Sequence, residues 1–426
     1  MPNPAVKSKL AGLKIKPQPT KPAGPVWAGP DGKGPNGGIT FSLLSRYLSC
    51  PERFRVRVVE GLRPADQFNH RIEYGNMWHV CEEAFARGDF TGHLTDDWVA
   101  PLEDYARELM KKYPLQQADI EKWYGVCCVQ FPVYVDYWSR NPDVIDRTPL
   151  LQEEPFDVPY KLPSGRTVRL RGKFDSVDLI DGGVYLQENK TKGDIDETQL
   201  RRQLTFDMQT MMYLVALKEM QHEEVFDHEV LKPFKEGVSL LGVRYNVVRR
   251  PLSGGEGNIV QRKPTKGSKC PKCKESGLID GENCPKCGGA GRVNPKPGET
   301  TDEYLDRLRG VIDGTGLNSD GEHYTGPSFW FMRWKIEVTP NDVKEFRRQC
   351  LDPILEQLLD WWSGVAPDAP RQHVPIDYRT PLNYRRPFGI VNSVDEYGYG
   401  DIDEYLNTGS EAGLRRVDDL FPELKV

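Results

Sequence analysis

Apolar and polar residues alternate between positions 153 and 190, and this alternation constrains the fold more than any other feature of the chain. Successive side chains of a β-strand point to opposite faces, so a period of two predicts strands rather than helices. We expect three strands here, the last two joined by a glycine-containing turn. They are Phe156–Val158, Thr167–Phe174 and Val184–Lys190.

The segments on either side of these strands follow helical patterns. Helices are expected over 43–48, 74–87, 96–112 and 117–140, then over 198–221, 301–312 and 341–363, with further strands over 238–248 and 328–338. A strand–strand–strand–helix–strand order favours an α/β fold, a mixed sheet flanked by helices with helical additions. We therefore expect a core over 39–250 that is completed by 301–426, whose last 60 residues look irregular.

The N-terminal segment, residues 1–38, differs in composition from the rest of the chain. It holds eight prolines, six lysines and a single acidic residue. Such a segment buries too little apolar surface to fold alone, so we expect a flexible basic tail.

The overall charge excludes one class of function. The chain of 426 residues has 57 Lys and Arg against 63 Asp and Glu, a formal net charge of −6. A protein that coats nucleic acid indiscriminately needs a broad positive surplus, which this chain lacks. No apolar run is long enough to span a membrane, and the N-terminus has no secretory signal, so we expect a cytoplasmic protein.

Two carboxylates and a lysine lie at the ends of the central strands. Asp175 ends one strand, and Glu188 and Lys190 lie two residues apart on one face of the next. A hairpin would bring the three together as a site for Mg²⁺ or Mn²⁺, with the lysine orienting a water nucleophile. The alternative is an ordinary solvated strand end, where an E-x-K triplet is common.

Five short motifs follow one another along the chain. Their residues are Ser42, Tyr47, Cys50, Pro51 and Phe54, then Gly75 and His79, Gly172 and Asp175, Glu188 and Lys190, and Gln209 and Tyr213. In this order they resemble the RecB-like branch of the PD-(D/E)XK nuclease superfamily, which includes phage exonucleases and CRISPR-associated nucleases. That branch has an S-x4-Y-x2-C-P-x-x-F helix, a G-x3-H helix, a G-x-x-D strand end, an E-x-K strand and a Q-x3-Y helix.

The resemblance implies a restriction-endonuclease-like core and a role for each matching residue. His79, Asp175 and Glu188 would bind the catalytic metal together with the backbone carbonyl of Asn189, and Lys190 would position the water. Gln209 and Tyr213 would hold the DNA strand near the scissile phosphate. Many relatives also join the first-helix cysteine to three later ones around an iron–sulfur cluster. Here Arg386 and Asn392 stand where two of those cysteines would be, so we expect no cluster at Cys50.

An insertion over 251–300 carries two C-x2-C pairs separated by ten residues. This spacing predicts a small zinc ribbon with one structural Zn²⁺, while free thiols or a redox pair are the alternatives. The four cysteines are Cys270, Cys273, Cys284 and Cys287.

Basic residues are concentrated just before and within this insertion. Between positions 244 and 274 there are nine basic residues and one acidic residue. Such a run suits contacts with DNA phosphates, although it also occurs in solvated loops. The candidates for phosphate binding are Arg249, Arg250, Arg262 and Lys263.

We interpret the chain as a metal-dependent deoxyribonuclease, of the phage exonuclease type, acting in DNA recombination, repair or processing in a phage-infected bacterial cell. The alternative is a non-catalytic DNA-binding or scaffold protein that uses its ribbon for interactions. The sequence contains no G-x4-G-K-[ST] loop, so any helicase partner would be a separate protein, as would a single-strand annealing protein.

Overall fold

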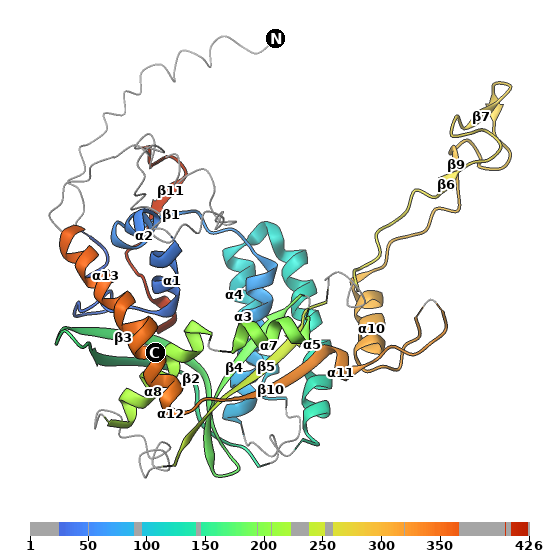
Figure 1. Ribbon diagram of the computed structural model, residues 1–426. Coiled ribbons are helices and arrows are strands. Elements are labelled where there is room, and N and C mark those ends of the chain that lie inside the picture. The colour runs from blue at the N-terminus through green and yellow to red at the C-terminus, as the bar shows by residue number, and fades with distance from the viewer. Residues whose placement is uncertain are drawn as a thin grey trace, which may run out of the picture. The chain divides into compact units, whose positions relative to one another are not determined.

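The computed structural model of the chain (Figure 1) comprises two compact units that alternate along the sequence. The smaller contains Ser42–Ala65 with parts of Met1–Gly38 and Leu358–Phe421, and the larger is built mainly from Asp66–Gln357. The structure describes residues 25–49, 51–88, 96–141, 146–193, 195–205, 207–222, 238–251, 259–318, 320–365, 405 and 410–424.

A five-stranded mixed sheet forms the centre of the larger unit. Its strand order is β10-β5-β4-β3-β2, in which β4 and β5 run parallel and the other neighbours antiparallel. The expected α/β fold with a mixed sheet is therefore confirmed. The strands are β2 (Thr148–Lys161), β3 (Thr167–Ile180), β4 (Gly183–Lys192), β5 (Leu240–Arg249) and β10 (Phe331–Glu337).

Strand β2 is much longer than the Phe156–Val158 segment expected from the sequence. Its three prolines, Pro149, Pro155 and Pro159, argue against a strand because proline donates no backbone hydrogen bond. However, β2 lies at the edge of the sheet that the described residues form, where it pairs with β3, and edge strands tolerate proline.

Helices of the larger unit lie before, between and after these strands. The helix expected over 198–221 is divided in two, because Asp207 accepts a hydrogen bond from the backbone of Thr210 and so starts a new helix. The segment 341–363 likewise contains two α-helices, separated by the π-helical turn Arg347–Leu351. The helices are α3 (His70–Arg87), α4 (Val99–Lys112), α5 (Gln117–Trp138), α7 (Glu197–Leu204), α8 (Met208–His222), α10 (Thr301–Ile312), α11 (Pro327–Trp330), α12 (Pro340–Phe346) and α13 (Asp352–Val365), the last of which continues into the smaller unit.

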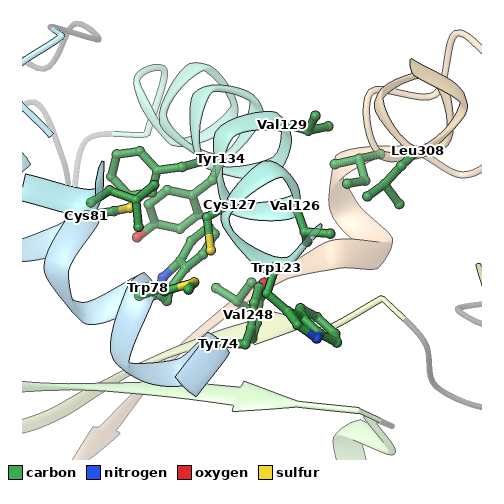
Figure 2. Close-up of a cluster of buried hydrophobic side chains, with 14 of the residues drawn as sticks. Tyr74, Trp78, Cys81, Trp123, Val126, Cys127, Val129, Tyr134, Val248 and Leu308 are labelled. Atoms are coloured by element: carbon green, nitrogen blue, oxygen red, sulfur yellow. The ribbon is translucent and has the colours of Figure 1, made fainter. Parts of the chain in front are cut away.

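An aromatic core joins α3 and α5 to one face of the sheet (Figure 2). The Trp78 ring of α3 packs edge-on against Phe131 and Tyr134 of α5, with centroids 5.3 and 5.2 Å apart. Val248 of β5 and Phe331 of β10 belong to the same buried cluster. Burial of these large side chains fixes the height of α3 above the sheet.

Helix α8 contacts β2 and β3. The Tyr213 ring contacts Phe156 and Phe174, with centroids 5.3 and 5.8 Å apart. A Cβ atom at Gly172 would lie 2.6 Å from the Phe156 ring and 3.1 Å from that of Tyr213. The glycine of the G-x-x-D motif therefore allows α8 to pack closely on β3.

The smaller unit includes a buried tryptophan from the N-terminal segment. Trp27 is fully buried and packs edge-on against Phe54, and its indole donates to the carbonyl of Gly38. Trp27 is thus an apolar anchor within residues 25–38, which belong to the segment expected as a flexible tail, while residues 1–24 lie outside the described residues. The remaining elements are α1 (Phe41–Ser49), α2 (Pro51–Phe54), the π-helix Arg55–Val59, and the antiparallel pair β1 (Leu62–Pro64) and β11 (Leu414–Arg416).

A buried ionic cluster lies within the sheet of the larger unit. The carboxylate of Asp178 on β3 contacts Arg147 and Arg244, at 2.9 Å in each case. Gln187 of β4 also accepts a hydrogen bond from Arg244. Asp178 and Arg244 are both inaccessible to solvent, so each charge depends on its partner.

Replacing Asp178 with Asn should destabilise the fold by about 3–5 kcal/mol, because two guanidinium groups would remain buried beside a neutral side chain. Urea unfolding followed by tryptophan fluorescence measures this change. The control is Asp104→Asn, at an exposed ion pair on α4 where little stability is expected to depend on charge. Equal unfolding midpoints for the two variants would show that the cluster contributes little.

Candidate active site

Strands β3 and β4 separate at the position of the two candidate carboxylates. Their ladder ends at the pair Ser176 and Gln187, so Asp175 and Glu188 are the next residues on each strand. Beyond this point β3 continues to pair with β2, while β4 pairs with β5. The polar side chains can therefore converge between two strands that no longer hydrogen-bond to each other.

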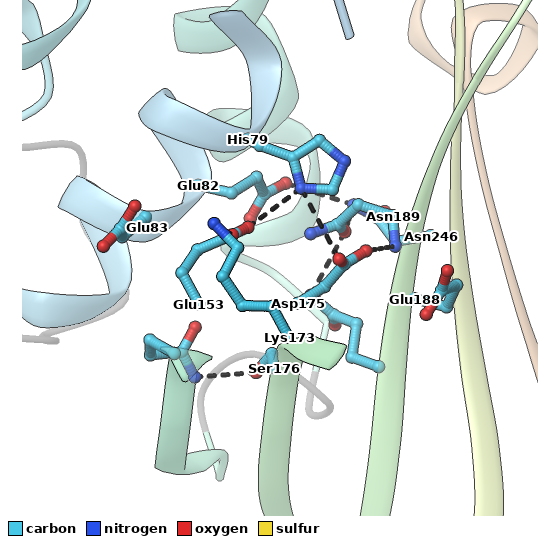
Figure 3. Close-up of polar contacts among 12 residues, drawn as sticks. His79, Glu82, Glu83, Glu153, Lys173, Asp175, Ser176, Glu188, Asn189 and Asn246 are labelled. Atoms are coloured by element: carbon cyan, nitrogen blue, oxygen red, sulfur yellow. Dashed lines mark hydrogen bonds and ion pairs between the residues drawn. The ribbon is translucent and has the colours of Figure 1, made fainter. Parts of the chain in front are cut away.

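One group of side chains lies between the sheet and α3 (Figure 3). The Nδ1 atom of His79 is 2.9 Å from Glu153 Oε1 and 3.7 Å from Asp175 Oδ1. Lys173 places its Nζ 2.5 Å from the other oxygen of Glu153. Single ligand atoms of His79, Glu153 and Asp175 all lie within 4.8 Å of one another, a spacing suitable for a shared metal ion.

A second group extends toward α8. Lys190 Nζ is 2.5 Å from Glu188 Oε1 and 3.3 Å from Gln209 Oε1. Gln209 in turn lies 3.4 Å from the hydroxyl of Tyr213. The structure thus brings together the E-x-K and Q-x3-Y residues that the sequence placed on separate elements.

Asn189 connects the two strands across the opening. Its backbone N–H donates to Asp175 Oδ2 at 2.8 Å. The N–H and C=O of a strand residue point to the same side, so the carbonyl of Asn189 is expected on the β3 side of β4 as well. Its side-chain oxygen accepts from Asn246 at 2.9 Å, which fixes Asn189 from the opposite side.

The net effect of burial and neighbouring charges is to raise the pKa values of His79, Glu188 and Lys190. Burial disfavours the protonated form of His79, but Asp175, Glu153 and Glu188 outweigh it and raise its pKa to about 9. Burial and the charge of Asp175 raise the pKa of Glu188 to about 7. Burial lowers the pKa of Lys190, but the neighbouring carboxylate of Glu188 raises it by more. The pKa of Lys190 is therefore raised, and the side chain is an ammonium group at neutral pH.

Two residues of this site were missed by the sequence analysis, Glu153 and Lys173. In the run Glu153-Glu154-Pro155, strand alternation alone does not indicate which glutamate faces the site. In the structure it is Glu153 that faces the site, and its backbone departs from regular strand geometry with a positive φ of 47°. A left-handed glutamate within a strand has no clear sequence signature.

The four cysteines of the insertion converge as predicted. The Sγ atoms of Cys270 and Cys284 are 3.8 Å apart, and those of Cys273 and Cys287 are 3.6 Å apart. Tetrahedral thiolates around zinc, each bound at about 2.3 Å, lie about 3.8 Å from one another, so the cluster fits this ion. Short strand pairs support it, formed by β6 (Ser268–Lys269) with β9 (Arg292–Val293) and β7 (Leu278–Ile279) with β8 (Glu282–Asn283).

The predicted DNA-binding arginines and lysine differ in exposure. Arg249 is 5% exposed, and its guanidinium lies 3.9 Å from the centre of the Phe329 ring, so it is placed in the interior. Arg250 is half-buried, whereas Arg262 and Lys263 are exposed. Cys50 lies outside the described residues, as do the positions 386 and 392 that bear on an iron–sulfur cluster.

Comparison with known families agrees with the geometry. The sequence model of the PD-(D/E)XK nuclease superfamily matches residues 39–312, well over half of the chain. This range contains both groups of site residues as well as the cysteine cluster. No curated protein matches the chain. Within the described residues, no helix is both long and apolar enough to cross a membrane.

Zinc removal should unfold the insertion but spare the sheet, because the cysteine cluster is the apolar centre of the insertion and shares no residue with the core around α3 and α5. Purified protein should contain about one zinc per chain, and Cys284→Ser should lose it. Metal analysis measures the zinc content, and far-UV circular dichroism measures the retained helix. Cys350→Ser is the control, since this half-buried cysteine lies outside the cluster. A fully zinc-free wild-type protein with free thiols would contradict the expectation.

Proposed function

Because the chain belongs to the PD-(D/E)XK nuclease superfamily, we propose that it is a metal-dependent deoxyribonuclease of the phage exonuclease type. The observation that carries this proposal is the convergence of Asp175, Glu188 and Lys190 where β3 and β4 separate. Phosphodiester hydrolysis requires charge neutralisation and an oriented water, and this residue set can provide both.

His79, Asp175 and Glu188, together with the carbonyl of Asn189, would hold the divalent cation. One feature of the site fits a cation: Glu188 Oε2 is buried and has no hydrogen-bond partner among the described residues. Burial of a carboxylate oxygen without a hydrogen-bond donor raises the free energy of the folded protein unless a cation lies beside it. Bound Mg²⁺ or Mn²⁺ would neutralise the phosphate and favour ionisation of water.

Lys190 and Gln209 act on the reacting groups. The ammonium of Lys190 is held by Glu188 and Gln209, which leaves it able to orient a water toward the phosphate. Gln209 is half-buried and contacts the DNA strand, while Tyr213 is 8% exposed and supports Gln209 through its hydroxyl.

The insertion contributes a second contact with DNA. Zn²⁺ bound by the four thiolates would hold the structure of the insertion and would leave no open position for a water, so it would take no part in hydrolysis. Exposed basic side chains cover the insertion and its base, where they can meet phosphates. They are Arg262, Lys263, Lys266, Lys269, Lys272, Lys274, Lys286 and Lys296.

The biological setting that we propose is DNA recombination, repair or processing in the cytoplasm of a phage-infected bacterial cell. An exonuclease of this kind exposes single strands, and a separate single-strand annealing protein would use them. A helicase partner would also be a separate protein, since this sequence has no phosphate-binding loop of the ATPase type.

Asp175→Asn and Lys190→Met should each lower nuclease activity by about 10³-fold, because they remove a metal ligand and the cation that orients the water. Digestion of 5′- and 3′-labelled single- and double-stranded DNA with Mg²⁺ or Mn²⁺ measures activity, polarity and strand preference together.

The matched control for this experiment is Lys161→Met, at an exposed lysine that ends β2. Its activity should equal that of the wild type. Wild-type protein that binds DNA but cuts none of the four substrates would reject the nuclease proposal in favour of a DNA-binding scaffold.

Replacing Lys266, Lys272 and Lys274 together with Ala should weaken DNA binding and flatten its salt dependence. Each lost phosphate contact should reduce the slope of log K against log salt by about 0.9 for duplex DNA. Fluorescence anisotropy over a salt series measures this change. Lys111→Ala on α4 is the control, since its ammonium is paired with Glu108. If the slope of log K against log salt is unchanged in the triple variant, these lysines do not contact DNA and the ribbon binds another partner.

A further inference from the structure

We propose that Glu153 is a further ligand of the divalent cation, on the side of the site that α3 covers. The proposal rests on the proposed function, since it concerns the same cation. It adds a carboxylate from the edge strand β2 to the set that the sequence motifs supply.

The distances suit a shared ion. Glu153 Oε1 lies 2.9 Å from His79 Nδ1, which lies 3.7 Å from Asp175 Oδ1. Neighbouring ligands of an octahedral Mg²⁺, bound at about 2.1 Å, are about 3 Å apart. The three atoms therefore need only small movements to enclose such an ion (Figure 3).

The backbone of β2 is adapted to present this carboxylate. Glu153 has a φ of 47°, although its neighbours Gln152 and Glu154 pair regularly with β3. Left-handed conformations are unfavourable for residues with a Cβ and concentrate at functional sites. The side chain of Glu153 is only 6% exposed, and its Oε1 lies beside His79 rather than in solvent.

The charges of the site call for another cation. Glu153 and Asp175 both lie beside His79, and Glu188 is the residue that follows the end of the β3–β4 ladder on the other strand. Lys173 pairs with Glu153, and Lys190 pairs with Glu188. Each pairing uses a single oxygen, Oε2 of Glu153 and Oε1 of Glu188. Glu188 Oε2 has no hydrogen-bond partner among the described residues, which is independent evidence for an ion in the site.

A different role for Glu153 would be to orient His79 alone, by accepting a hydrogen bond from Nδ1–H. Glu153→Gln separates the two roles. The amide oxygen of glutamine still accepts this hydrogen bond, but it lacks the negative charge that a hard cation prefers. Glu153→Asp keeps the charge and withdraws the oxygen by one methylene group.

The experiment is a calorimetric titration of the full-length protein with Mn²⁺, in the absence of DNA. Glu153→Gln and Glu153→Asp should raise the dissociation constant by about tenfold or more. The matched control Glu154→Gln, one residue along β2, should stay within about twofold of the wild type. Circular dichroism and urea midpoints confirm that each variant is folded.

Titration of Asp175→Asn with Mn²⁺ separates a failure of the inference about Glu153 from a failure of the proposed function. If Asp175→Asn abolishes Mn²⁺ binding while Glu153→Gln binds like the wild type, Glu153 is not a ligand and the proposed function stands. If Asp175→Asn also binds Mn²⁺ like the wild type, the cation site of the proposed function is wrong, and the inference about Glu153 falls with it.

Discussion

The separation of β3 from β4 after the Ser176–Gln187 pair is the constraint on which the candidate site depends. A strand that leaves its partner exposes backbone groups that must find other hydrogen bonds. Here the N–H of Asn189 donates to the side chain of Asp175, so a carboxylate replaces the missing strand partner. The same contact that satisfies the backbone also fixes the rotamer of Asp175, which leaves its Oδ1 directed toward His79.

Asn246 extends this arrangement to the helix above the sheet. Its amide nitrogen lies 2.9 Å from Asn189 Oδ1 and 3.1 Å from Glu82 Oε1. Glu82 comes three residues after His79 on α3, which is almost one helical turn. One buried amide therefore links α3 to β4 by hydrogen bonds, and such bonds are strong in a low-dielectric interior. The positions of His79 and Asn189 are coupled through it.

Much of the fold and of the site could be predicted from local sequence patterns. Period-two alternation located β3 and β4, and motif order located Asp175, Glu188, Lys190 and Gln209, since each has a neighbour at fixed spacing on its own element. Features that depend on tertiary context could not be predicted in this way. The length of β2 was hidden by prolines that only an edge strand tolerates, and Glu153 depends on an irregular backbone. The role of Trp27 as an apolar anchor depends on its contacts with Phe54 and Trp362, which are far from it in the sequence.

The insertion is joined to the larger unit in a way that makes it separable. Its two ends run beside each other, with Thr265 bridged to Lys296, and Glu299 holds the base together through Arg262 and Arg307. Within the described residues, the two ends of the insertion therefore lie close to each other near Arg262 and Glu299. A segment with such adjacent ends can be lost, gained or exchanged during evolution without a shift in strand register. The proposed DNA contact of the insertion can therefore change independently of the candidate active site.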